Sequence, residues 1–70
     1  METIQFSLTS DYIELFKLLK ITGFFDSGGA AKYAVSQGLI KVDGKIETRK
    51  ACKIRTGQRV EVDGTIISVG

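Results

Sequence analysis

One stretch of the chain, residues 27–44, decides the fold. It reads Ser27-Gly28-Gly29-Ala30-Ala31-Lys32-Tyr33-Ala34-Val35-Ser36-Gln37-Gly38-Leu39-Ile40-Lys41-Val42-Asp43-Gly44. Ser27 can cap a helix through its hydroxyl, and Gly38 is a natural end for that helix. Asp43-Gly44 then lies between two short strand-like runs, which is a strong hairpin signal. The stretch therefore predicts a helix followed at once by a β-hairpin.

Another helix is expected just before this stretch. Asp11 and Glu14 have the spacing of a capping box, and Gly23 suits the left-handed end of a helix. The apolar side chains that follow the helical period are Tyr12, Leu15, Phe16 and Leu19. Because alanines are frequent in the second helix, the two helices can pack closely together.

The remaining segments predict short strands. Residues 3–8 alternate apolar and polar side chains, 48–53 are interpreted as a loop, and 55–58 as a turn. Strands are expected at 59–62, with Val60 and Val62 inward, and at 65–69 after a second Asp-Gly turn. This order predicts an α+β fold in which two helices pack on a small, mostly antiparallel sheet. No linker divides residues 1–70, so a single domain is expected.

Charge is concentrated in one third of the chain. Residues 41–60 hold seven of the ten basic side chains and two acidic ones, a net charge of +5, whereas the whole chain has a net charge of only +2. Such a cluster is typical of a surface that contacts phosphates, although it is also compatible with a solvated face that has no partner.

Composition argues against catalysis and against a metal site. The chain has no histidine and one cysteine, Cys52, so no catalytic residue, metal ligand set or cofactor is predicted, and we expect no enzyme. Gly28-Gly29 could cradle an anion at a helix start, but packing glycines are the favoured interpretation. A single cysteine, and the lack of a signal peptide or long apolar run, predict a cytoplasmic protein without membrane or small-molecule partners.

Residues 27–44 resemble the S-four RNA-binding domain, a family named after a small-subunit ribosomal protein. In that family a serine opens the second helix, an Ala-Arg pair follows, and a Gly-x-Val-x-Val-Asn-Gly run comes next. Here Ala31-Lys32, Gly38 and Asp43-Gly44 stand in those places. Residues 54–62 are similar to the family's closing Val-x-x-Gly-Asp-x-Val-x-Val. The resemblance covers roughly residues 12–62 and implies a two-helix αL motif that binds structured RNA.

The chain departs from many members of the family at two positions. Glu14-Leu15-Phe16 stands where an Arg-Leu-Asp start is common, and Gly28 stands where an arginine often follows the serine. Together with residues 47–54, this pattern looks most like the YbcJ-like branch, in which the domain is the whole protein. The resemblance thus implies a small stand-alone RNA-binding protein.

RNA is therefore the expected partner, in a structured or double-stranded form such as rRNA or a tRNA-like fold. Basic side chains would contact phosphates, and the aromatic residues are interpreted as core rather than as a base-stacking platform. A monomer is expected. The candidate RNA-binding residues are Lys17, Ser27, Lys32, Lys41, Lys45, Arg49, Lys50, Lys53 and Arg55.

Two other functions remain open at this point. Phe24 and Phe25, if exposed at the turn between the helices, would form a docking patch for a protein. A ubiquitin-like sulfur carrier also ends in a strand and glycine, but such carriers resemble one another in a terminal Gly-Gly, and this sequence reads Ser68-Val69-Gly70.

Overall fold

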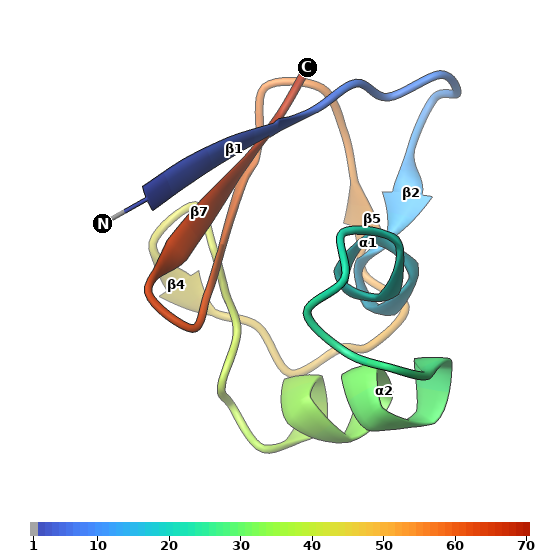
Figure 1. Ribbon diagram of the computed structural model, residues 1–70, viewed down its shortest axis with the longest axis vertical. Helices are drawn as coiled ribbons and strands as arrows, with labels where there is room; N and C mark the ends of the chain where they lie inside the picture. The colour runs from blue at the N-terminus through green and yellow to red at the C-terminus, as the bar shows by residue number, and fades with distance from the viewer. Residues whose placement is uncertain (1) are drawn as a thin grey trace.

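The computed structural model describes residues 2–70 and has an α+β architecture (Figure 1). A five-stranded sheet has the order β1-β7-β6-β3-β4, and a separate two-stranded sheet pairs β2 with β5. The strands are β1 (Glu2–Phe6), β2 (Ile13–Glu14), β3 (Lys41–Val42), β4 (Lys45–Ile46), β5 (Lys53–Ile54), β6 (Arg59–Val62) and β7 (Thr65–Val69), and the helices are α1 (Leu15–Ile21) and α2 (Gly28–Ser36).

The larger sheet is mostly antiparallel, as predicted. Its exception is the pair β1 and β7, which run parallel with Ile4 opposite Ile67. Beyond this pair, the N–H of Leu8 donates to the carbonyl of Gly70 (2.8 Å), and the N–H of Gly70 donates to the carbonyl of Phe6 (2.9 Å). The first and last strands that the structure describes therefore lie side by side in one sheet.

The core lies between the helix pair and the inner face of the sheet. On β6, Val60 and Val62 are buried as predicted, and they alternate with side chains that face outward. Ala31 and Ala34 are buried, which lets α2 approach α1 closely, whereas Ala30 is exposed. The largest fully buried side chains are Leu15, Leu18, Leu19, Ile40, Ile54, Ile67, Val35 and Val60.

The predicted start of the first helix at Asp11 is wrong. Glu14 is extended at the N-cap (φ −69°, ψ 140°), and α1 begins only at Leu15. The reason is a long-range contact: residues 13–14 form β2, which pairs with β5 and takes the place of a first helical turn. The interpretation of Tyr12 as a core residue of this helix is therefore also wrong, because Tyr12 precedes β2 and its side chain is 40% exposed.

The predicted turns are confirmed. Gly38 (φ +76°) follows α2, and Asp43 and Gly44 both have positive φ (+51° and +83°), as a two-residue hairpin requires. Segment 48–53 is a loop only in part, since Lys53 belongs to β5. A strand of two residues carries too little pattern to be predicted from the sequence.

Replacing Ser27 by alanine should lower the free energy of unfolding by about 1 kcal/mol, a typical loss for an N-cap. The Ser27 hydroxyl accepts a hydrogen bond from the Ala30 N–H (3.1 Å), and alanine cannot replace that acceptor. Urea unfolding followed by circular dichroism measures the change, with S27T as the matched control that retains a hydroxyl. Equal stability of S27A and wild type would contradict the capping role.

Candidate nucleic-acid interface

Five exposed basic side chains gather around the start of α1. Segment 50–55 lies against this helix because Glu14 pairs with Lys53 in the small sheet and because the Phe16 N–H donates to the Lys50 carbonyl (3.1 Å). The ribbon shows β2 and β5 adjoining α1, with α2 below it (Figure 1). We name these five side chains the basic face: Lys17 on α1, Lys32 on α2, and Lys50, Lys53 and Arg55 on segment 50–55.

Two aromatic rings lie beneath four of the five cations of the basic face. The Lys32 ammonium is 4.6 Å from the centre of the Phe16 ring, and the Lys17 ammonium is 5.9 Å from it. Cations at such distances are attracted to the face of an aromatic ring. Phe16 therefore holds one ammonium group from each helix near its ring.

Tyr12 lies beneath two further cations of the basic face. The Lys53 ammonium is 4.9 Å from the centre of its ring, and the central carbon of the Arg55 guanidinium is 5.6 Å from it. Arg55 also donates a long hydrogen bond from Nη1 to the Asp11 carbonyl (3.5 Å). Tyr12 thus connects the segment before β2 to β5 and to the residue that follows it.

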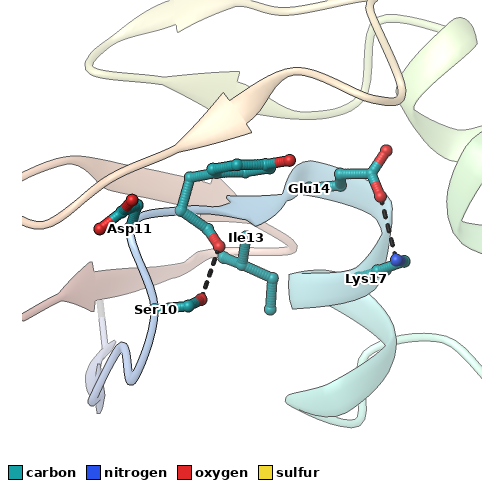
Figure 2. A pocket seen from close by; sticks show the side chains of 6 residues that line it. Ser10, Asp11, Ile13, Glu14 and Lys17 are labelled. Carbon is teal, nitrogen blue, oxygen red and sulfur yellow. Dashed lines mark hydrogen bonds and ion pairs between the residues drawn. The ribbon is translucent and has the colours of Figure 1, made fainter.

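Beside Tyr12 the surface is hollowed, and the hollow is lined by Ser10, Asp11, Tyr12, Ile13, Glu14 and Lys17. Figure 2 shows Ser10 and Asp11 on the loop that leads into β2, and Glu14 and Lys17 at the start of α1. The Glu14 carboxylate forms an ion pair with the Lys17 ammonium (3.0 Å). The hollow is therefore bordered by a cation but contains two carboxylates.

Arg49 lies next to the basic face in sequence but is engaged in an ion pair. The Glu47 carboxylate accepts hydrogen bonds from Nε (3.0 Å), Nη2 (3.1 Å) and the backbone N–H (2.9 Å) of Arg49. The Glu47 side chain is only 16% exposed. These hydrogen bonds lower the pKa of Glu47 to about 2.

Cys52 is a half-buried free thiol that packs against the core. Burial, together with the negative charge of Glu47, raises the pKa of the Cys52 thiol. A thiol with a raised pKa is a poorer nucleophile, because the thiolate is the reactive form. The geometry therefore gives Cys52 a packing role.

The other predicted residues lie apart from the basic face. Lys41 and Lys45 are exposed on the hairpin β3–β4, and Lys41 stands opposite Glu61 of β6. In Figure 1, β4 is on the other side of the molecule from β2 and β5. The Ser27 hydroxyl is used in capping α2. The structure thus brings five of the nine predicted residues together.

Sequence reasoning missed the two aromatic side chains of this site. Phe16 and Tyr12 follow the helical period, which predicts core residues; Phe16 does pack against the core and Tyr12 does not, and the structure places cations over both rings. Gly28 packs beside Phe16, where an added Cβ would lie 3.7 Å from the ring, and the packing interpretation of this glycine accordingly fits. The sequence signal nearest to this site is the run of basic residues in segment 50–55. Nothing in the sequence shows that this segment pairs with residues 12–14, next to Tyr12.

Within the described part of the chain, no group of three or more His, Cys, Asp or Glu side chains is arranged to hold a metal ion. Neither helix that the structure describes has the length and apolar character needed to cross a membrane.

Comparisons with known proteins agree on one family. A family model described as S4 domain matches residues 6–70. YbcJ of Escherichia coli strain K12, named as a candidate RNA-binding protein, and YbcJ of Shigella flexneri are each 48% identical over 58 residues, which cover 83% of this chain and 83% of the relative. The solution structure of E. coli YbcJ, described as revealing an ALFAL motif involved in RNA-binding, matches with a TM-score of 0.70 and 47% identity, over 93% of this chain and 84% of that one.

Replacing Glu47 by glutamine should destabilise the protein at neutral pH and much less at low pH. The pKa of Glu47 is about 2 in the folded protein against an ordinary value of 4.5, so the unfolded chain binds this proton more tightly. The stabilisation is complete above pH 4.5 and is lost as the pH falls toward 2. Urea unfolding of wild type and E47Q across this range should give free energies of unfolding that converge as the pH falls. A constant difference between the two proteins would contradict the assignment.

Proposed function

The chain belongs to the S4 domain family, as the resemblance of residues 27–44 predicted, and we propose that it binds folded RNA without catalysis through the basic face. The observation that carries this proposal is the convergence of four exposed cations from three separate segments on the rings of Phe16 and Tyr12, with Lys50 joined to them through its backbone contact with Phe16. The name of E. coli YbcJ and the description of its solution structure, at nearly half identity, support RNA as the ligand.

The basic face suits the phosphate backbone of a folded RNA. Its side chains are four lysines and one arginine, which attract phosphates without distinguishing bases. Because the cations lie on both helices and on segment 50–55, they match phosphates that folding of the RNA has brought close together. We therefore favour RNA with paired regions, of the rRNA or tRNA kind. Lys41, Lys45 and Arg49 would contact flanking phosphates.

We also propose that the protein acts as a monomer in the cytoplasm. The free thiol of Cys52 is compatible with a reducing compartment. A monomer is compatible with the basic face, whose five residues all lie on one chain.

One observation favours a second function, the docking of a protein. Phe24 and Phe25 are only half-buried, and with Ile40, Val62 and Asp63 they line an apolar hollow next to Leu39, whose side chain is 65% exposed. The sulfur-carrier hypothesis has less support, because Gly70 is held in the sheet. Its N–H donates to the Phe6 carbonyl, and its carbonyl accepts from the Leu8 N–H.

Replacing Lys32 by alanine should weaken binding to any folded RNA and reduce the slope of log K against log salt by about 1, the value expected for one lost phosphate contact. Fluorescence anisotropy with a labelled RNA hairpin across a salt series measures both quantities. The matched control is R59A, which changes the net charge equally but lies on β6, beside Glu61 and away from the basic face.

The control variant R59A should change the slope by less than about 0.3, since long-range charge effects are screened by salt. Equal effects of K32A and R59A would show that net charge alone determines binding. Failure of the wild-type protein to bind RNA at low salt would contradict the proposed function itself.

A further inference from the structure

We infer that the hollow beside Tyr12 holds one unpaired nucleotide of the bound RNA, with its base stacked on the Tyr12 ring. This inference rests on the proposed function and adds a feature that phosphate contacts do not supply. It assigns a place for a base that has left the RNA helix, and so it predicts which folded RNAs bind best.

The Tyr12 ring is placed where a base could stack on it. Tyr12 lies outside the core, 40% of it is exposed, and it lines the hollow. An aromatic ring exposed at a nucleic-acid surface is a stacking partner for any base, because every base has a flat π face. Tyr33 is exposed as well, at 67%, but it lines none of the described hollows and has no cation over its ring.

Different segments supply the cations over the Tyr12 ring and the lining of the hollow. The cations over the ring, Lys53 and Arg55, come from β5 and the residue after it. The hollow is lined by residues 10–14 and by Lys17, with no contribution from β5. A nucleotide in this position can therefore place its base in the hollow and its phosphate near the cations of segment 53–55.

The charges that line the hollow disfavour a phosphate there. Asp11 and Glu14 line it, and the only cation in its lining, Lys17, is already paired with Glu14 (3.0 Å). Because Lys17 and Glu14 offset each other, the Asp11 carboxylate leaves the lining with a net negative charge, which repels a phosphate at close range. A neutral base is not repelled, and its exocyclic amino groups can donate to carboxylate oxygens. The hollow therefore favours a base over a phosphate.

The segment that holds Tyr12 is already fixed in the free protein. The Ser10 hydroxyl donates to the Tyr12 carbonyl (2.9 Å), and residue 13 pairs with Ile54. Since little ordering is left to be done on binding, the stacking free energy is retained as affinity.

Binding measurements with two RNA hairpins test the inference. The hairpins have the same stem and loop, and one carries a single bulged nucleotide. Wild-type protein should bind the bulged RNA at least about 5-fold more tightly, since stacking of one base on an aromatic side chain gives about this much or more. Y12L should lose at least about 5-fold in affinity for the bulged RNA and less than about 2-fold for the paired one, while Y12F, which retains the ring, should keep the preference.

A second measurement reads the contact directly. The chain has two tyrosines and no tryptophan, so NMR spectra of a sample with labelled tyrosines contain two sets of ring signals. The bulged RNA should shift the ring signals of Tyr12 further than the paired RNA does, and both RNAs should leave those of Tyr33 in place.

The outcomes separate this inference from the proposed function. Equal binding of both hairpins by wild type, or an equal loss for both in Y12L, would overturn the nucleotide site and leave the basic face intact. Absence of binding to either hairpin would overturn the proposed function. A preference for the bulged RNA that survives in Y12L, with unshifted Tyr12 signals, would place the unpaired base elsewhere and also overturn the inference.

Discussion

The docking of the start of α1 onto segment 50–54 is the contact on which the site depends. A helix of seven residues leaves a large share of its first N–H groups without partners inside the helix. Two of these groups are satisfied from outside, because Leu15 donates to the Cys52 carbonyl (2.9 Å) and Phe16 donates to the Lys50 carbonyl (3.1 Å). The pairing of β2 with β5 continues this contact. A short helix and a basic loop are thereby fixed against each other.

The loop that provides those carbonyls has its own support. Glu47 binds both the backbone and the guanidinium of Arg49, and the Cys52 N–H donates to the Arg49 carbonyl (3.1 Å). Cys52 then packs against the core. Arg49 thus shapes the loop that presents Lys50 and Lys53, whatever direct contact it makes with RNA. Like charges on one small face repel each other, and the rings of Phe16 and Tyr12 offset part of that cost through cation–π attraction.

Local features of the fold were predictable from the sequence, and long-range pairings were not. The cap at Ser27, the glycine after α2 and the Asp43-Gly44 hairpin depend on neighbouring residues, and the structure confirms them. The parallel pair β1–β7 and the small sheet β2–β5 join segments far apart in the chain, and the latter overrides an apparently good capping box at Asp11. The local sequence of residues 11–14 favours a helix start and does not show that β5 will pair with residues 13–14 instead.

The same division holds for the candidate site. Sequence reasoning found all five cations of the basic face, because charge can be counted without a fold. It also included Lys41 and Lys45, which the register of β3 and β4 places on the hairpin, apart from the others. The core prediction holds for Phe16, which packs against the core, and fails for Tyr12, since a helical period cannot tell a buried residue from one that precedes a strand and faces solvent. Only the tertiary structure shows which of the predicted residues lie together on one face.

The most direct test of the account is an NMR titration of the labelled protein with a folded RNA, following every backbone amide. We expect the largest shifts on residues 12–17, on the first turns of α2 and on segment 50–55, which are remote from one another in sequence and meet at the start of α1. Shifts confined to the outer face of the sheet, around Arg59, Glu61 and Ile66, would contradict the account.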